Sequence, residues 1–174
     1  MSGADLPSLF LENAAKAAAG THLLSGAGAL REILARIVPP DAKVYCPGVT
    51  EIERAVAAFF PNRVADYAGA TVTVEEVFGA VAETGSLVCA SEGGRAVQAG
   101  LLPPHHVAIV RRGKIFVTLD SLFSAVAAAP PTNLTLVTGP SRTADIERVL
   151  TIGVHGPGRF AIIAVDEDVK GGIA

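Results

Sequence analysis

The segment 134–157, LTLVTGPSRTADIERVLTIGVHGP, constrains the fold of this chain more than any other part of the sequence. It opens with LTLVT, whose β-branched and aliphatic side chains favour a buried strand. Gly139-Pro140 ends that strand, because proline cannot donate to a ladder and glycine permits a sharp turn. Next come a polar turn, a short stretch with apolar residues at helical spacing, a second polar turn and the run FAIIAV. The pattern predicts strand, helix and strand, which together form a βαβ unit.

The middle of this segment has the composition of a helix. Ser141, Arg142 and Thr143 form a polar start, since hydroxyls accept hydrogen bonds from free backbone N–H groups, and Asp145 falls in the first turn. The apolar residues that follow recur at helical spacing and are Ile146, Val149 and Leu150. Gly153 ends the predicted helix, and His155-Gly156-Pro157 forms the second turn.

Upstream, helical and strand patterns alternate in the same way. Helices are predicted at residues 8–19, 27–38 and 50–60, the last with Thr50 as N-cap, and a strand is predicted at 43–46. Residues 63–70 form a candidate strand, and residues 73–82 fit a helix at their start and a strand at their end. Alternating elements of this kind predict an α/β domain with three layers, Rossmann-like, around a mostly parallel sheet.

The middle of the chain contains two predicted hairpins. Glu83-Thr84-Gly85 resembles a tight turn into the strand 86–90, with a positive φ expected at the glycine. The strand 107–110 is expected to pair with 115–119 through the charged turn RRGK. A helix capped by Asp120 or Ser121 and a final strand at 160–165 complete the prediction.

Composition agrees with one compact domain of 174 residues. Half of the residues are hydrophobic and 18% are charged, which parallel strands covered on both faces explain. No apolar run approaches the ~18 residues that a membrane span needs. The first twenty residues lack a basic region followed by an apolar core, so no signal peptide is expected and the protein is predicted to be cytoplasmic. The formal net charge of −3 argues against a nucleic-acid-binding surface.

The sequence carries no cofactor signature. Cys46 and Cys89 are far apart and form no CxxC motif, so this chain cannot supply four thiolates to an iron–sulfur cluster. Neither GxGxxG after a strand nor GxxxxGK[ST] occurs. We therefore expect a colourless protein without a cluster or a flavin.

Several of these segments also carry a family resemblance. TGPSRTADIE followed by GVHGP closely resembles the signature of the LUD-domain family, the lactate utilisation protein C (LutC/YkgG-like) proteins. AETGSLV at 82–88, Arg95 and LLPPHHVAIV at 101–110 extend the resemblance in the same order and spacing. It covers roughly residues 70–165. Residues 1–70 match weakly and are expected to cover the sheet, and residues 166–174 are expected to form a loose tail of the same single domain.

The resemblance implies more than the residues do. Proteins of this family are similar in fold to the NagB/RpiA/CoA-transferase-like superfamily and are linked to the oxidation of lactate to pyruvate. They act there beside separate iron–sulfur subunits, which would be the partners of this chain and would hold the clusters that it lacks.

The residues themselves suggest an anion site at the turn after the strand 134–138. In an open α/β sheet, ligands bind beyond the carboxyl ends of the strands, where loops converge. Backbone donors, hydroxyls and a guanidinium could hold a small carboxylate or phosphate there. The candidate ligand-binding residues are Gly139, Ser141, Arg142, Thr143, Asp145, His155 and Gly156, with Glu83, Thr84, Gly85 and Arg95 around the same cleft.

Structural explanations for the same residues stay open. Ser141 and Thr143 can simply cap the helix while Arg142 pairs with Asp145, and Glu83 and Thr84 can serve only to shape the hairpin. A metal site is not expected, because the adjacent His105 and His106 point to opposite faces of a strand.

Two functions of different classes follow. One is a non-redox subunit of a lactate-oxidising system that binds a small anionic ligand. The alternative is a stand-alone transferase or isomerase acting on a phosphorylated sugar or an acyl-CoA. A ligand-sensing role is a third reading.

Overall fold

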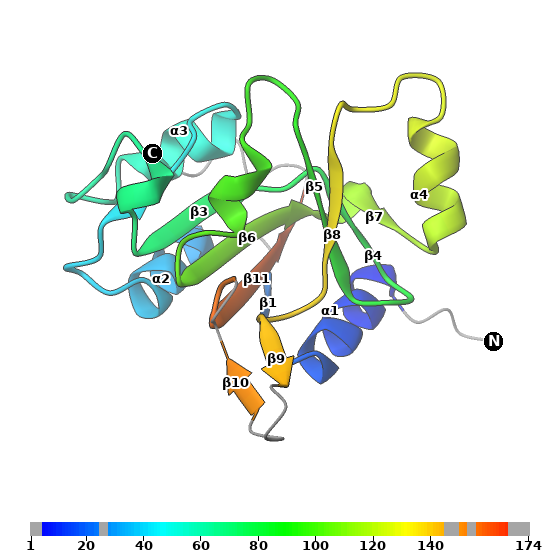
Figure 1. Ribbon diagram of the computed structural model, residues 1–174, viewed down its shortest axis with the longest axis horizontal. Helices are drawn as coiled ribbons and strands as arrows, with labels where there is room; N and C mark the ends of the chain where they lie inside the picture. Colours follow the sequence, from blue (N-terminus) through cyan, green and yellow to red (C-terminus); the bar gives the residue numbers. More distant parts are fainter. Residues whose placement is uncertain (1–4, 25–27, 145–149, 153–155, 167–174) are drawn as a thin grey trace.

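The fold is built on a five-stranded sheet in which every neighbouring pair is parallel (Figure 1). The computed structural model describes residues 5–24, 28–144, 150–152 and 156–166. Across the sheet the strand order is β1 (Gly20–Leu24), β11 (Arg159–Val165), β6 (His105–Arg111), β3 (Val72–Glu76) and β2 (Val44–Tyr45). The prediction of an α/β fold with a mostly parallel sheet is confirmed.

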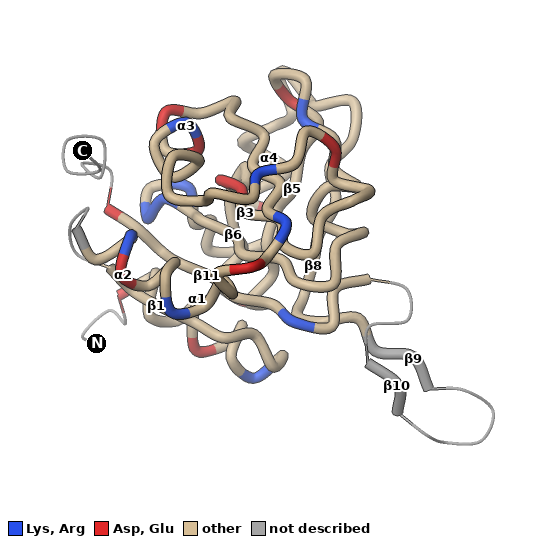
Figure 2. Tube along the Cα trace, turned by 90° about the vertical axis from the view of Figure 1, so that its left-hand side faces the viewer, with Lys and Arg blue, Asp and Glu red and all other residues tan. Residues whose placement is uncertain are grey.

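The central strands are apolar on both faces because both faces are covered. Along β6, Val107 and Ile109 contribute to one core, whereas Ala108 and Val110 contribute to another. The helices α2 (Gly28–Ile37) and α3 (Glu51–Ala57) cover the first face. The continuous apolar runs of the sequence therefore correspond to strands with two buried faces, and charged residues lie mainly in helices and loops (Figure 2).

The second face is covered by the helix α1 (Leu6–Lys16) and by a smaller sheet. The order in this sheet is β7 (Ile115–Phe116), β4 (Gly79–Val81), β5 (Ser86–Ala90) and β8 (Leu134–Val137). β4 and β5 form the predicted antiparallel hairpin, and Gly85 has the expected positive φ of 67°. The helix α4 (Leu119–Val126) places Leu122 against the outer side of this sheet.

The predicted helix after β8 is wrong where the structure describes it. Residues on both sides of the gap form the strands β9 (Arg142–Ala144) and β10 (Leu150–Ile152), which pair antiparallel with Thr143 opposite Thr151. β-branched residues suit such a ladder, and this pairing outweighs the helix-start signal of the hydroxyls. β8 itself pairs antiparallel with β5, so segment 134–157 is not a βαβ unit. Asp145, Ile146, Val149, Gly153 and His155 lie outside the described residues, as does the predicted tail from residue 167.

Four other local predictions differ from the structure, and one strand was not predicted. Residues 73–76 belong to β3 and are not helical, because their side chains are buried on both faces. Ile115 follows a 3-10 turn, η3 (Arg112–Lys114), and pairs with β4 instead of β6. Thr118, two residues before the predicted cap, accepts the Ser121 N–H at the start of α4. The candidate strand 63–70 contains a single bridge and the 3-10 turn η1 (Tyr67–Gly69), and β1 was not predicted.

No helix within the described parts of the chain is long and apolar enough to span a membrane.

Two glycines fix the turns of the small sheet against α1. A Cβ atom at Gly85 would lie 2.3 Å from the backbone nitrogen of Ala14, and one at Gly139 would lie 2.1 Å from the carbonyl oxygen of Ala17. Both glycines also have a positive φ, 67° and 74° respectively. The close approach of these backbones therefore requires glycine at both positions.

We expect Gly85→Ala and Gly139→Ala each to lower the free energy of unfolding by about 3 kcal/mol, because backbone strain and steric overlap add. Gly94→Ala is the matched control, since Gly94 has φ +83° but open space around its Cα. Gly94→Ala should lower the free energy of unfolding only by the cost of the backbone strain, about 1–2 kcal/mol. Urea unfolding of the three variants measures the difference, and equal losses would contradict the packing argument.

Candidate functional site

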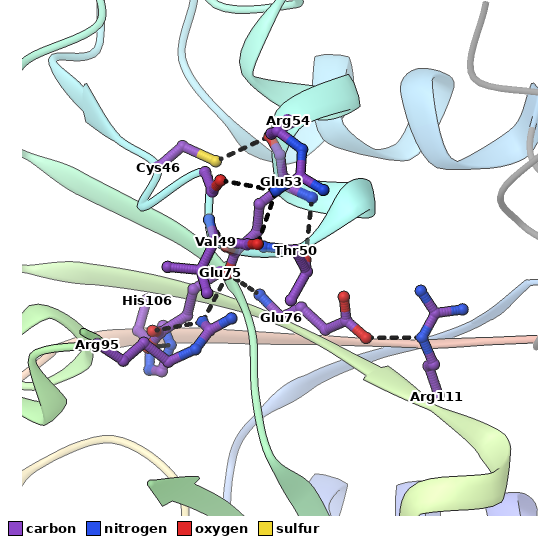
Figure 3. A network of polar contacts seen from close by, with 11 residues as sticks. Cys46, Val49, Thr50, Glu53, Arg54, Glu75, Glu76, Arg95, His106 and Arg111 are labelled. Carbon is purple, nitrogen blue, oxygen red and sulfur yellow. Dashed lines mark hydrogen bonds and ion pairs between the residues drawn. The ribbon is translucent and has the colours of Figure 1, made fainter. Parts of the chain in front are cut away.

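A buried glutamate, Glu53, organises the polar residues at the carboxyl edge of the parallel sheet (Figure 3). α3 starts directly after β2, and Thr50 and Glu53 form a capping box at its first turn. Oε2 of Glu53 accepts hydrogen bonds from the N–H groups of Val49 at 2.8 Å and Thr50 at 3.1 Å. Oε1 accepts from the N–H of Glu76 at 2.9 Å and from Nη1 of Arg95 at 2.6 Å. One carboxylate thereby joins α3, the end of β3 and the loop after β5.

Arg95 connects this carboxylate to a second buried acid. Its Nη1 lies 3.6 Å from Oε2 of Glu75, whose other oxygen lies 2.9 Å from Nε2 of His106. Oε1 of Glu75 and Nε2 of His106 lie close together without the geometry of a hydrogen bond, and both ring nitrogens of His106 lack a hydrogen-bond partner. His106 is fully buried and packs edge-on against Phe160. The result is a polar chain, Glu53–Arg95–Glu75–His106, inside the protein.

The strand register explains why Glu75 and His106 meet. In the parallel pair β3–β6, Thr73 is opposite His106 and Glu75 is opposite Ala108, so these side chains share one face. The 3-10 turn η2 (Val97–Gly100) covers that face, and Oγ1 of Thr73 donates to the carbonyl oxygen of Ala99 at 2.5 Å. A Cβ atom at Gly100 would lie 2.6 Å from Oε1 of Glu75. The covering turn therefore lies directly on the buried acid.

A small pocket of ≈ 180 Å³ opens beside this chain at the carboxyl edge, and we call it the carboxyl-edge pocket. Its polar lining comes from Thr50, Glu76, Glu92, Arg95 and Lys114. Oε1 of Glu76 accepts from Nε of Arg111 at 2.7 Å, whereas its Oε2 is buried without a partner. The pocket thus combines two cationic side chains, Arg95 and Lys114, with two carboxylates, Glu76 and Glu92.

Neither cysteine is suited to act as a thiolate. Cys46 is buried and donates through Sγ to the carbonyl oxygen of Glu53 at 3.3 Å, and burial, reinforced by the charge of Glu53, raises its pKa to about 12. Burial and, to a smaller extent, Glu75 also raise the pKa of Cys89. Within the part of the chain that the structure describes, no three His, Cys, Asp or Glu residues are grouped so that they could hold a metal ion.

The two adjacent histidines lie on opposite faces of β6, as the strand periodicity predicts. His106 contacts Glu75, whereas His105 lines a separate cavity at the amino edge together with Val72 and Arg159. His105 has a pKa lowered to about 4, mainly by burial and then by the charges of Arg159 and His106. It is therefore a neutral imidazole at neutral pH.

The residues predicted around the turn 83–85 have structural partners. Oε1 of Glu83 accepts from the N–H of Leu119 at 2.7 Å, at the first turn of α4. The hydroxyl of Thr84 lies 2.7 Å from that of Ser86, which lies 2.6 Å from that of Thr138. Gly85 packs on α1, as Gly139 does.

The remaining predicted residues lie elsewhere. The N–H of Ser141 donates to the carbonyl oxygen of Pro157 at 2.9 Å, so the two polar turns of segment 134–157 do meet, with Gly156 against Ser141. Arg142 and Thr143 are in β9, and Asp145 and His155 lie outside the described residues. Of the predicted site residues that the structure describes, only Arg95 belongs to the polar chain and lines the carboxyl-edge pocket. Anion binding by the predicted set stays a prediction.

Sequence reasoning missed Glu53, Glu75, Glu76, His106 and Lys114. Two signals were available. Glu53 stands three residues after Thr50, which is the spacing of a capping box, and Glu75-Glu76 interrupts an otherwise apolar run. Charged residues in a run that is buried on both faces require partners, and such residues are therefore candidates for a site.

Replacement of Glu53 tests its role as the joining group. We expect Glu53→Ala to lower the free energy of unfolding by about 3–5 kcal/mol, because Arg95 and three backbone donors lose a buried partner. Glu32→Ala, at an exposed position of α2, should cost about 0.5 kcal/mol. Chemical denaturation of both variants measures this, and a small loss for Glu53→Ala would rule out the joining role.

The lowered pKa of His105 predicts a pH dependence of stability. The unfolded chain takes up this proton as the pH falls below 6.5, and the folded protein does so only near pH 4. The free energy of unfolding is therefore not reduced by this group above pH 6.5, and it declines as the pH falls from 6.5 towards 4. Urea unfolding at about pH 7 and about pH 5 should show a larger loss for the native protein than for His105→Gln. Equal losses would contradict the assignment.

A solved structure has the same fold as this chain, and a known protein family matches its sequence. A protein described as a DUF162 family protein from Deinococcus radiodurans, solved at 1.70 Å, superposes with a TM-score of 0.72. This likeness covers 95% of this chain and 99% of that one at 23% sequence identity, and it supports the fold alone.

Two curated relatives are each named Lactate utilization protein C. The one from Macrococcus caseolyticus is 34% identical over 111 residues, which is 60% of this chain and 47% of the relative. The one from Deinococcus radiodurans is 40% identical over 91 residues, which is 49% of this chain and 42% of the relative. The chain spans about half the length of the curated relatives that it matches.

The family described as the LUD domain matches residues 62–165. The match includes β3 to β11, together with Glu75, Arg95 and His106 of the polar chain and most of the residues that line the carboxyl-edge pocket. Because it covers more than half of the sequence, the chain belongs to the LUD-domain family.

Proposed function

We propose that this protein is the non-redox subunit of a lactate-utilisation system and that its carboxyl-edge pocket binds a small 2-hydroxy acid. The names of the relatives from Macrococcus caseolyticus and Deinococcus radiodurans support the first part. The chemistry of the pocket supports the second.

The combination of charges in the pocket carries this proposal. A 2-hydroxy acid such as lactate presents a carboxylate and, one carbon away, a hydroxyl donor. Lys114 and Arg95 provide cations for the carboxylate, and the Glu76 side chain that lines the pocket provides an acceptor for the hydroxyl. The pocket also lies at the carboxyl ends of the strands, where open α/β sheets bind ligands.

The size of the pocket favours a small acid over the alternative substrates. Its ≈ 180 Å³ is below the ~300–1,000 Å³ of typical cofactor-sized pockets. An acyl-CoA or a phosphorylated sugar would extend well beyond it. Turnover of either compound by the isolated chain would overturn the proposal.

Oxidation of lactate to pyruvate releases two electrons, and we propose that partner iron–sulfur subunits accept them. The chain has two cysteines, too few for the four thiolates of a typical cluster. The raised pKa values of both thiols also oppose thiolate ligation. This subunit would therefore bind and orient the acid without holding a redox group.

Binding measurements test the ligand. We expect Lys114→Ala to weaken binding of L-lactate by about 10-fold or more, because one charge-assisted hydrogen bond is lost. Lys43→Ala is the matched control, since Lys43 is also exposed but precedes β2 at the opposite edge of the sheet. Calorimetric titration of the two variants measures the affinities, and equal affinity for both would argue against the pocket.

The hydroxyl contact has a test that needs no mutation. Propionate has the carboxylate of lactate without the hydroxyl, so the native protein should bind it about 10-fold more weakly if Glu76 accepts that hydroxyl. Equal affinity would leave Glu76 without this role.

A genetic experiment tests the role in the cell. Deletion of the gene in its own host should abolish growth on L-lactate and leave growth on pyruvate intact. Loss of growth on both carbon sources, or on neither, would overturn the assignment to lactate utilisation.

A further inference from the structure

A second cavity, of ≈ 340 Å³, lies at the amino edge of the parallel sheet, opposite the carboxyl-edge pocket. We call it the amino-edge cavity. Val72, His105 and Arg159 line it at the starts of β3, β6 and β11, where they are neighbours in register. The link between α2 and β2 forms its other wall, with Pro39 and Asp41.

Backbone hydrogen bonds hold these walls in place. The N–H of Ala42 donates to the carbonyl oxygen of Pro39 at 3.0 Å. The N–H of Thr71 donates to the carbonyl oxygen of Lys43 at 2.9 Å. The N–H of Arg159 donates to the carbonyl oxygen of Pro104 at 3.1 Å. Each wall is thus tied to a strand of the sheet, so the cavity is formed before any ligand arrives.

Three side chains in this cavity have polar groups for which the described part of the chain provides no partner. His105 is 5% exposed, and its Nδ1 is buried without a hydrogen bond. Asp41 and Arg159 are exposed, carry opposite charges and line the same cavity. Within the described residues, neither forms an ion pair with the other or with any other group.

We propose that the amino-edge cavity binds a small α-amino acid with an apolar side chain. The carboxylate pairs with Arg159, the ammonium group pairs with Asp41, and the side chain packs on Val72 and the prolines Pro39 and Pro104. Both ends of a zwitterion find a partner here, whereas a simple acid would leave Asp41 facing it unpaired.

The size of the cavity agrees with this class. At ≈ 340 Å³ it is near the lower end of the ~300–1,000 Å³ range of small-molecule sites, so it suits an amino acid rather than a nucleotide. The site is separate from the carboxyl-edge pocket, and it does not depend on a role in lactate utilisation.

Titration of the full chain with L-valine, followed by backbone amide NMR, tests the proposal. We expect saturable shifts at Val72, His105 and Arg159. Asp41→Asn and Arg159→Gln should each weaken binding about 10-fold or more, because each removes one charge-assisted contact. Both residues are exposed, so the melting temperatures should hardly change.

Two controls make the test specific. Isovalerate, which is valine without the ammonium group, should bind about 10-fold more weakly than valine. Lys114→Ala, at the opposite edge, should leave valine binding unchanged. Absence of saturable shifts with valine would overturn the proposal, as would equal binding of valine and isovalerate together with no effect of Asp41→Asn.

Discussion

The burial of the Glu53 carboxylate is the constraint on which the rest of the structure depends. A carboxylate without contact with water is tolerated only when donors surround it, and Glu53 has four. These donors come from the turn before α3, from the end of β3 and from the loop after β5, so one side chain fixes three segments that are far apart in the sequence. The helix α3 could be held against the sheet by apolar packing alone, but the position of Arg95 could not.

Arg95 in turn determines where the polar chain and the carboxyl-edge pocket lie. It is the cation between Glu53 and Glu75, and it also lines the pocket beside Lys114. An anion in the pocket and the two buried carboxylates would therefore share one guanidinium group. The affinity of the pocket and the stability of the core are coupled through this residue, so a substitution at Arg95 would change both. For this reason Lys114, which is exposed and outside the network, is the better position at which to separate binding from folding.

The two edges of the parallel sheet differ in their chemistry. At the carboxyl edge, charged side chains pair with one another and leave a small pocket, as at Glu76 and Arg111. At the amino edge, Asp41 and Arg159 line a larger and more apolar cavity without pairing. Parallel strands produce this division because all their carboxyl ends emerge on one side. The adjacent His105 and His106 face different surroundings for the related reason that neighbouring residues of a strand point to opposite faces.

The sequence by itself determined the class of the fold, the β4–β5 hairpin with its positive-φ Gly85, and the cap of α3 at Thr50. All of these depend on residues a few positions apart, whose side-chain periodicity and turn chemistry are local. Tertiary structure decided the pairing of β7 with β4 instead of β6, the β9–β10 pairing where a helix start was predicted, and the contact of Arg95 with Glu53. Segments with several hydroxyl-bearing and β-branched residues can form a helix start or a strand nearly equally well. Whether such a segment becomes a strand therefore depends on whether a partner strand is available to pair with it. The meeting of Glu53, Arg95, Glu75 and His106 depends on sheet register and on the path of loops that join distant segments. No local pattern specifies it, because the free energy that selects it comes from burying these groups together.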